Sequence, residues 1–599
     1  MRRLYIIFIK RNTFILDKLK HLILLFVLVN TQLLSAQQAV TLDETVFIHA
    51  NATTFVSGET LLFKVYCLKS TDKTPSEVSK IAYVELVDES KKSVFKTKIV
   101  LEKSTGQGDY FIPTTLKTGN YKLIGYTTWT LNKPVSELFQ IDIAVINPFT
   151  KEEKKPVGNS SNTKNITLET NNNENHTAEI SNSNTNLKLS LPKKVFSNRE
   201  LVDLKVESTN SLAADGNYSL SVRKIDILPI KNQISAHEFA PVSSNKTLLN
   251  IQNPVNKIHL PELRGELISG KVTAKNNTDN VQNLTVALSI PGKSFAFEIT
   301  QTDANGNFIF NIKNVYYTSN ITVQIIDDKA NNYDLALQNI SNIDYSKINL
   351  NPGLDLSYTT KETLLERSIS SQIENAYYHK KVSTISKTPT LDPFYFPLAK
   401  QYILDDYTRF KTLKETVTEV ATELYLKQND GKTRLHVNDP SIFPQLQESA
   451  LVLIDGLYLE NQNELLTYPM KNVYKIELIV GRYYVGAKAF NGLVSFTTFN
   501  KDFVSNQTGS FILNTTILRP QPKKTYNKIE YAANADNERI PDFRNQLFWN
   551  PNVTLKNDNN LFYTSDLSGT YEIKLEGFTK SGSAVSLRET IEVKETSAN

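Results

Sequence analysis

The stretch ALVLIDGLYLENQNELLTYPMKNVYKIELIVGRYYVGAKAFNGLVSFTTF, residues 450–499, decides the fold of the middle of this chain. Its first apolar run, residues 451–454, ends at Asp455-Gly456, a dipeptide that favours a tight hairpin turn because both residues accept positive φ. A further strand is predicted over residues 473–480, and Asn491-Gly492 leads into another over residues 493–498. The stretch therefore predicts a small domain built around these strands.

The same stretch resembles the plug domain of TonB-dependent outer-membrane receptors. Receptors of this family carry the pattern G-x-x-x-x-N-G-x-I-x-I-x-T. The matching residues here are Gly486, Asn491, Gly492 and Thr498, with Val494 and Phe496 in the two isoleucine places. In the family a helix that opens with T-L-x-E precedes the strands, and TLKE stands here at residues 412–415. The resemblance implies a plug-like α+β domain over residues 430–505.

Arg482, Tyr483 and Tyr484 depart from the receptor pattern, which has small residues before its glycine. A movement linked to transport is therefore not expected. A receptor barrel that encloses a plug needs about 22 strands of roughly ten residues, whereas 100 residues follow residue 499 here. We expect a plug-like fold reused as a soluble domain, with Arg482, Tyr483 and Tyr484 as its protein-binding residues, because tyrosine supplies contact area at low entropic cost.

Residues 1–36 are typical of a cleaved signal peptide. Six basic residues precede the apolar run LILLFVLV, and Leu34-Ser35-Ala36 offers a small-residue cleavage site. The run is far shorter than the ~20 apolar residues that span a bilayer. We expect export to the periplasm or the outer membrane, with membrane association only through a partner. Cys67 is the single cysteine, so no internal disulfide is possible, and it is expected to pack within a strand.

Period-two alternation over residues 37–148 predicts an antiparallel β-sandwich. Its segments FVSGETLLFKVYCL and LKTGNYKLIGYTTW resemble a macroglobulin-like domain of the alpha-2-macroglobulin family. Residues 149–186 are rich in Asn, Ser, Thr, Lys and Glu and predict a polar linker. Residues 187–262 predict a second, partial macroglobulin-like sandwich followed by a connection.

Residues 263–335 resemble a carboxypeptidase regulatory-like sandwich. The resemblance rests on a strand that ends in GKV and on the hairpin pattern T-D-x-N-G-x-F at residues 302–308. Residues 336–429 predict a helical connector with amphipathic helices over 359–381 and 398–428, because apolar residues recur there at intervals of three and four. Residues 506–599 predict further strands and a C-terminal sandwich. The fold class is mainly β with a small α+β part, arranged as a string of sandwiches.

Several chemistries are not expected. The 67 basic and 62 acidic residues nearly balance, so no surface for nucleic acid is predicted. GELISGKV at residues 265–272 has valine where a phosphate-binding loop needs a hydroxyl, and residues 303–314 lack the glutamate that closes a calcium loop. No H-E-x-x-H, cysteine pair, G-x-S-x-G or cysteine-glutamine thioester motif is present. We predict no cofactor, no metal and no catalytic residue.

The order of modules resembles exported multidomain proteins from Bacteroidota. The hypothesis is a non-enzymatic envelope binding or scaffold protein that docks onto an outer-membrane protein, such as an outer-membrane β-barrel, or onto an exported protein. Docking would use an edge strand or an aromatic patch, and linkers would allow the modules to re-orient. One alternative is a soluble accessory or remnant of a TonB-dependent uptake system. Another is an enzyme whose site is assembled from dispersed residues, which histidines clustered with carboxylates would favour.

Overall fold

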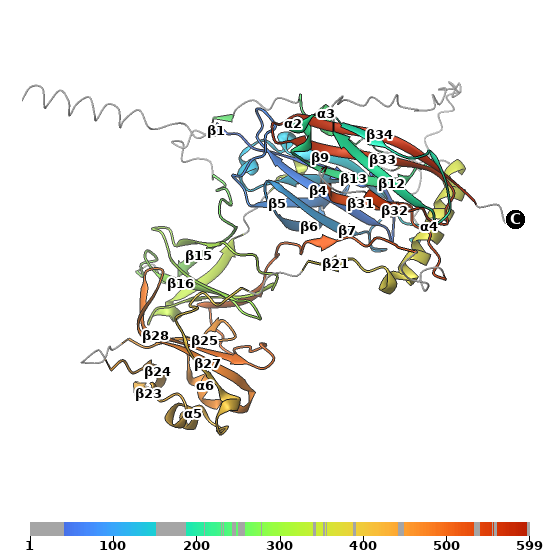
Figure 1. The fold of residues 1–599 in the computed structure, drawn as a ribbon. Helices are drawn as coiled ribbons and strands as arrows, with labels where there is room; N and C mark the ends of the chain where they lie inside the picture. The colour runs from blue at the N-terminus through green and yellow to red at the C-terminus, as the bar shows by residue number, and fades with distance from the viewer. Residues whose placement is uncertain are drawn as a thin grey trace, which may run out of the picture.

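The computed structural model (Figure 1) describes residues 41–150, 187–208, 210–228, 231, 233–241, 247–248, 258–276, 278–338, 343–350, 354, 356, 358–386, 391–429, 431–440, 448–531, 539–553, 555 and 560–595. The predicted signal peptide and nearly all of the predicted linker lie outside these residues. The described part is mainly β, and the predicted fold class is confirmed. Figure 1 shows blue, green and red strands together in one body, and yellow-green and orange strands in a second.

The first sandwich comprises two sheets of the N-terminal segment. One has the order β2-β4-β7, with β2 at Thr45–Ala50, β4 at Thr60–Leu68 and β7 at Thr105–Phe111. The other has the order β3-β9-β8-β5-β6, with β3 at Thr54–Val56, β9 at Phe139–Ile146, β8 at Gly119–Tyr126, β5 at Ile81–Val87 and β6 at Ser93–Val100. Cys67 lies in β4 and is fully buried, so its predicted place in a strand is confirmed.

The second sandwich joins two segments that are far apart in the sequence. One sheet has the order β10-β12-β32, with β10 at Leu187–Ser190, β12 at Leu201–Ser208 and β32 at Asn560–Tyr563. The other has the order β11-β34-β33-β13-β31, with β11 at Val195–Ser197, β34 at Ala584–Lys594, β33 at Gly569–Thr579, β13 at Gly216–Lys224 and β31 at Gln546–Val553. The division into separate units at 187–262 and 506–599 is therefore wrong, because β13 lies between two C-terminal strands.

The two sandwiches share one contact region. The Phe47 ring of the first sandwich and the Phe578 ring of the second lie with their centroids 5.4 Å apart, edge to face. The Tyr66 hydroxyl donates to the Glu576 carbonyl at 3.0 Å. Both aromatic rings belong to the same buried core cluster. The interface is thus apolar with interior hydrogen bonds, a construction that holds two domains in one orientation.

A third sandwich is formed mostly by residues 266–338. One sheet has the order β18-β15-β20, with β18 at Asn307–Ile312, β15 at Glu266–Ala274 and β20 at Tyr333–Gln338. The other has the order β17-β16-β19-β29, with β17 at Ala296–Gln301, β16 at Thr285–Ile290, β19 at Asn320–Ile325 and β29 at Ile512–Thr516. The Asp303 carboxylate accepts from the backbone N–H groups of Asn305 and Asn307, each at 2.8 Å, and so forms the predicted hairpin turn.

The mixed domain, residues 400–505, contains the stretch quoted first. Its main sheet has the order β22-β27-β28-β25-β26, with β22 at Lys400–Ile403, β27 at Val473–Val485, β28 at Lys488–Thr498, β25 at Leu451–Ile454 and β26 at Leu457–Tyr458. A hairpin of β23 at Leu424–Asn429 and β24 at Lys432–Val437, and the short helices α5 at Leu413–Glu419 and α6 at Asn463–Thr467, pack onto it. The predicted strands are present, and β27 is longer than predicted.

The second predicted helix, residues 398–428, is mostly wrong. The one α-helix described there is α5; β22 and a 3-10 turn at Leu404–Asp406 precede it, and β23 follows it. The Thr412 hydroxyl accepts from the Glu415 N–H and the Glu415 carboxylate accepts from the Thr412 N–H, so a capping box fixes the start of α5. Residues 424–429 pair with β24 across their whole length, and this pairing overrides the three- and four-residue spacing of their apolar side chains.

The first predicted helix is present as α4, Lys361–Ala376, but its orientation differs from the expected one. The residues of α4 that are buried are Arg367, Ser368, Ser370 and Ser371. Leu365 and Ile369, which belong to the apolar spacing that predicts this helix, are 59% and 46% exposed. Arg367 instead reaches inward to carboxylates of both neighbouring sandwiches, and of the apolar residues Leu364 packs against a buried cluster.

Helices long and apolar enough to cross a membrane do not occur among the residues that the structure describes. The path of the chain is nested and does not run as a simple string. After the mixed domain, the chain returns through β29 to the third sandwich, through β30 at Lys524–Thr525 to β21 at Thr384–Ile385, and through β31 to the second sandwich. The second and third sandwiches are thus joined by two segments of the chain, and so are the third sandwich and the mixed domain.

Candidate interaction site

The three predicted binding residues lie on the far half of β27, but they do not share one face. Arg482 and Tyr484 point to one side, where Tyr484 is 64% exposed. The Arg482 guanidinium lies 5.9 Å from the centroid of the Tyr484 ring, and it donates to the Glu448 carboxylate at 3.1 Å. Tyr483 points to the other side and packs against a buried cluster that contains Phe297. The exposed pair is therefore Arg482 and Tyr484.

Burial also separates the two tyrosines chemically. The surroundings of Tyr483 disfavour a charged phenolate, and burial raises the pKa of its hydroxyl. Its ring is a structural contact between the mixed domain and the third sandwich. The sequence could not distinguish the neighbours, because adjacent residues of a strand always face opposite sides and only the position of the next domain decides which side is covered.

Packing against the third sandwich fixes the hairpin that carries the pair. Gly486, at the turn between β27 and β28, has φ of +56°. A Cβ atom on Gly486 would lie 2.7 Å from the Ile299 carbonyl oxygen of β17. Only glycine allows this close approach, so the hairpin turn is seated on the third sandwich. The seated turn therefore holds the backbone at Arg482 and Tyr484 in place, without help from the contacts of their own side chains.

Hydrogen bonds at the opposite edge of the same sheet join the two domains further. The Tyr458 N–H donates to the Ser289 hydroxyl at 3.1 Å, and the Gln324 side-chain amide donates to the Tyr458 carbonyl at 3.0 Å. All three residues are buried. The edge strand β26 is thus covered by the third sandwich. This differs from the hypothesis of freely re-orienting modules, because buried hydrogen bonds and apolar contacts hold these two modules together.

The free edge of the sheet is at β27. β22 pairs with β27 only from Lys475, which lies opposite Ile403, to Leu478, which lies opposite Lys400. Beyond Leu478, β27 continues to Val485 with β28 as its one strand partner in the described part of the chain. The ladder shifts register between Ile479 and Arg482, where Gly481 has φ of +95°. This bulge separates the segment that carries Arg482 and Tyr484 from the part covered by β22.

A serine and a histidine meet inside the molecule, which the sequence did not indicate. His49 Nδ1 lies 2.7 Å from the Ser219 hydroxyl, and the Tyr66 hydroxyl lies 2.8 Å from the same oxygen. Ser219 and His49 have no exposed surface, and burial holds the pKa of His49 well below its usual value. These hydrogen bonds join the first and second sandwiches. A substrate has no access to the Ser219 hydroxyl or the His49 ring.

The described residues offer no group of three or more His, Cys, Asp and Glu side chains that could hold a metal ion. The Cys67 thiol donates to the Glu44 carboxylate at 2.9 Å. Burial and the negative charge of Glu44 raise the pKa of Cys67 well above its usual value. Cys67 is therefore a buried, protonated thiol and lacks the thiolate character that a nucleophile requires.

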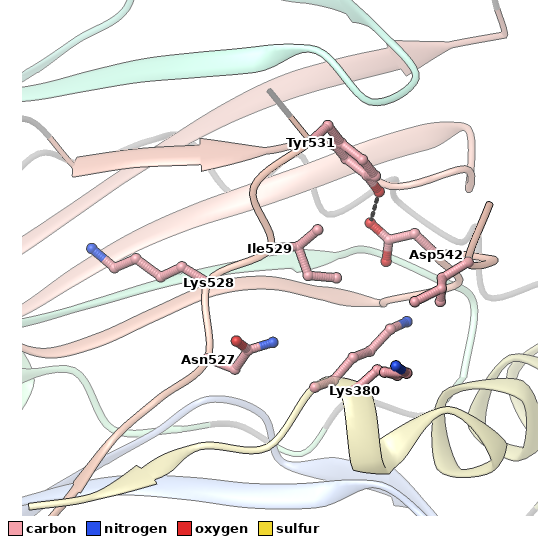
Figure 2. A pocket seen from close by; sticks show the side chains of 8 residues that line it. Lys380, Asn527, Lys528, Ile529, Tyr531 and Asp542 are labelled. Atoms are coloured by element: carbon pink, nitrogen blue, oxygen red, sulfur yellow. Dashed lines mark hydrogen bonds between the residues drawn. The ribbon is translucent and has the colours of Figure 1, made fainter. Parts of the chain in front are cut away.

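A small cavity lies between the end of α4 and the segment before β31 (Figure 2). It is lined by Lys380, Lys381, Asn527, Lys528, Ile529, Tyr531, Ile540 and Asp542. Its volume is about 40 Å³, which is far below the roughly 300 Å³ of a small-molecule site. Figure 2 shows the Tyr531 hydroxyl pointing to the Asp542 carboxylate, to which it donates at 2.5 Å. The space suits ordered water better than a substrate.

No family model matches the chain, and no curated protein matches it. Among solved structures, a mutant of Salmonella alpha-2-macroglobulin is similar, at 9% identity over 92% of this chain and 39% of that chain, with a TM-score of 0.22. A trypsin-activated alpha-2-macroglobulin from Escherichia coli is similar at 9% identity over 93% and 24%, with a TM-score of 0.15. The Yersinia pseudotuberculosis adhesin InvE is similar at 10% identity over 49% and 59%, with a TM-score of 0.13. The chain spans about two fifths of the length of the first of these.

Proposed function

We propose that the protein is a non-enzymatic binding or scaffold protein of the cell envelope, and that it docks onto an outer-membrane or exported protein through the surface that bears Arg482 and Tyr484. The observation that carries the proposal is the exposure of Tyr484, 64%, on a hairpin whose turn is seated on the third sandwich. A large aromatic side chain on a pre-organised backbone loses little freedom when it binds, and such residues dominate binding free energies.

The chemistry of the surface supports protein binding over small-molecule binding. Arginine and tyrosine are enriched at the centres of protein interfaces. The side chain of Arg482 is 45% exposed even though its guanidinium contacts Glu448, so it can donate further hydrogen bonds to a partner. In contrast, the cavity at α4 is too small for a substrate, and the Ser219 and His49 pair is closed to solvent. These features support binding over catalysis.

The envelope location rests on the predicted signal peptide, and the nature of the partner rests on the plug-like pattern of residues 430–505. A domain that resembles the stopper of a barrel is suited to contact a barrel rim or another exported chain. We therefore place the partner in the same compartment, as an outer-membrane β-barrel or an exported protein.

Site-specific photo-crosslinking in the full chain tests the proposal. A benzophenone amino acid replaces Tyr484, cells are irradiated, and the crosslinked envelope proteins are identified by mass spectrometry. We expect one specific partner. In a pull-down, Tyr484→Ala weakens its capture by about tenfold or more, as is usual for an interface hot spot. The matched control is Tyr378→Ala, because Tyr378 is 60% exposed on the same chain but lies far from β27 in sequence, on the 3-10 turn after α4.

Equal capture by the Tyr484→Ala and Tyr378→Ala variants would refute the surface. Recovery of a TonB-dependent barrel would favour the uptake-accessory alternative for the partner. Turnover of a small substrate by the purified protein, without any specific crosslink, would favour the enzyme alternative.

A further inference from the structure

We propose that residues 393–398, which we call the apolar turn, form a second contact of the same interface and hold the partner protein by burial of apolar side chains. This inference rests on the proposed function, since it concerns the partner that contacts Tyr484. It goes further in naming a second set of contact residues and the chemistry of the partner surface that covers them, which is apolar and uncharged.

The apolar turn exposes several large side chains within a short span. Phe394, Phe396 and Leu398 are 40%, 50% and 74% exposed. Pro397, which lies between two of them, is exposed as well. With roughly 150–200 Å² for each large side chain, about 300 Å² of apolar surface faces water here. An apolar patch of this size on one chain often marks an interaction site.

Hydrogen bonds fix the apolar turn before any partner binds. Tyr395 is 1% exposed, and its hydroxyl donates to the Glu477 carboxylate of β27 at 3.0 Å. The Phe396 N–H donates to the Pro393 carbonyl at 2.9 Å, and the Leu398 N–H donates to the Tyr395 carbonyl at 3.3 Å. The buried tyrosine therefore anchors the exposed residues around it. Binding to a turn that is already ordered costs less conformational entropy than binding to a mobile segment.

The apolar turn lies beside the part of β27 that bears the exposed pair. Tyr395 and Tyr483 belong to one buried cluster between the mixed domain and the third sandwich. Tyr483 stands between Arg482 and Tyr484 in the sequence. The turn and the strand thus pack through their inward tyrosines and leave the neighbours of these tyrosines exposed. One partner surface can contact both.

The ladder between β22 and β27 links the two surfaces a second time. Lys400 lies opposite Leu478. Continued by two positions toward the apolar turn, the same register places Leu398 beside Val480, which is 39% exposed. Val480 precedes Arg482 by two positions. The apolar surface therefore extends from the turn onto β27.

The charges near the apolar turn indicate an uncharged occupant. Residues 393–399 contain no charged side chain. The two cations closest to the surface in sequence already have carboxylate partners, because Lys400 pairs with Glu423 and Arg482 pairs with Glu448. A charged residue of the partner placed on the turn would lose its hydration and gain no opposite charge. The free energy of binding at the turn must come from apolar burial.

Photo-crosslinking from separate positions of the full chain tests the inference. A benzophenone amino acid replaces Leu398 in one strain and Tyr484 in a second. A third strain carries it at Ile309, a matched control that is 42% exposed in β18 of the third sandwich. We expect Leu398 and Tyr484 to crosslink to the same protein, and Ile309 not to crosslink to it.

The protein identified in this way, once purified, distinguishes apolar burial from charge. Phe396→Ser and Leu398→Ser should each raise the Kd for it by about tenfold, whereas Ile309→Ser should leave the Kd unchanged. For the unaltered chain, the Kd should change by less than about threefold between about 50 mM and 500 mM sodium chloride, because salt screens charges and not apolar contacts. Unchanged urea unfolding midpoints show that the variants remain folded.

The outcomes separate the inference from the proposed function. A crosslink from Tyr484 without one from Leu398 would overturn the apolar turn as a contact and leave the proposed function intact. A crosslink from Leu398 alone would refute the proposed function and, with it, the shared interface. Crosslinks from Leu398 to lipid or to a second copy of the chain would overturn the partner protein as its occupant. A tenfold or larger rise of the Kd with salt would overturn recognition by apolar burial.

Discussion

Arg367 of α4 and Glu59 of the first sandwich form a buried ion pair. The guanidinium donates twice to the carboxylate, from Nε at 3.1 Å and from Nη2 at 2.5 Å, and both side chains are at most 9% exposed. Arg223 of the second sandwich donates to the same carboxylate at 3.0 Å, and Arg367 also contacts Asp226 at 3.0 Å. Three elements that are distant in sequence thus meet at one charge cluster.

Removal of Arg367 should destabilise the fold strongly. Burial raises the pKa of Glu59, but the charges of Arg367 and Arg223 outweigh this and hold the pKa below its usual value. Arg367→Met leaves a buried carboxylate with less compensation and should cost about 3–5 kcal/mol in the free energy of unfolding by urea. The control is Lys580→Met. The ion pair between Lys580 and Asp215 is exposed, so this substitution should cost less than about 1 kcal/mol. Equal losses would contradict the role of burial.

Glu262 should make stability decrease as the pH rises from about 4.5 to about 7. Burial, helped by the charge of Glu266, raises the pKa of Glu262 to about 7, although Leu267, Lys98 and Tyr83 act in the opposite direction. In this pH range the folded state keeps a proton that the unfolded state has lost. The contribution therefore falls by about 1.4 kcal/mol per pH unit, roughly 3 kcal/mol in total. Glu262→Gln should flatten this part of the stability curve in urea unfolding, and parallel curves for the two proteins would refute the shift.

Substitution of Leu365 or Ile369 should leave stability almost unchanged. Both side chains are about half or more exposed on α4, so Leu365→Ser and Ile369→Ser should change the free energy of unfolding by no more than about 0.5 kcal/mol. A helix with these residues in the core would instead lose about 2–5 kcal/mol per site. Thermal or urea unfolding of the two variants distinguishes the orientations directly.

Gly486→Ala should displace the hairpin from the third sandwich. The added Cβ would meet the Ile299 carbonyl at 2.7 Å, and the residue would also hold an unfavourable φ of +56°. Gly431→Ala is a matched control, because Gly431 has φ of +74° but nothing within 4 Å of the added atom. We expect the control to cost about 1 kcal/mol and Gly486→Ala to cost more. The measurement is urea unfolding combined with amide exchange of residues 296–301.

The Cys67 thiol should not react with iodoacetamide in the folded protein at pH 8. It is fully buried, and burial and Glu44 keep its pKa well above the usual value. Alkylation should therefore report unfolding and should follow the same urea dependence as circular dichroism. Rapid labelling in the absence of denaturant would show that β4 opens locally.

Local features of the fold could be predicted from the sequence. Alternation predicted the strand around Cys67, a short apolar run before Asp455-Gly456 predicted the strand at Leu451, and the TLKE signature predicted the start of α5. Each of these depends only on residues close together in the sequence. Arg482, Tyr483 and Tyr484 were singled out by their departure from a family pattern, which carries no information that Tyr483 packs inward while Tyr484 is exposed.

Distant pairings could not be predicted. The residues around Ser219 do not indicate that its hydroxyl lies 2.7 Å from the Nδ1 atom of His49, which is 170 positions away in the sequence. They also do not indicate that β13 lies between β31 and β33. α4 is instructive because its apolar spacing is real, yet Arg367 determines which side faces inward. An ion pair in a buried site depends on carboxylates that other segments supply, and periodicity carries no information about them.

The sequence by itself determined the mainly β class, the positions of most strands and turns, and the absence of familiar catalytic motifs, since each depends on residues within a short span. Only the tertiary structure decided that residues 187–224 and 546–594 share a sandwich, that Tyr483 is partly buried while Tyr484 is exposed, and that β27 extends beyond its pairing with β22. The physical reason is that strand partners and covered faces are set by hydrogen bonds and packing between distant segments, which the order of residues does not specify locally.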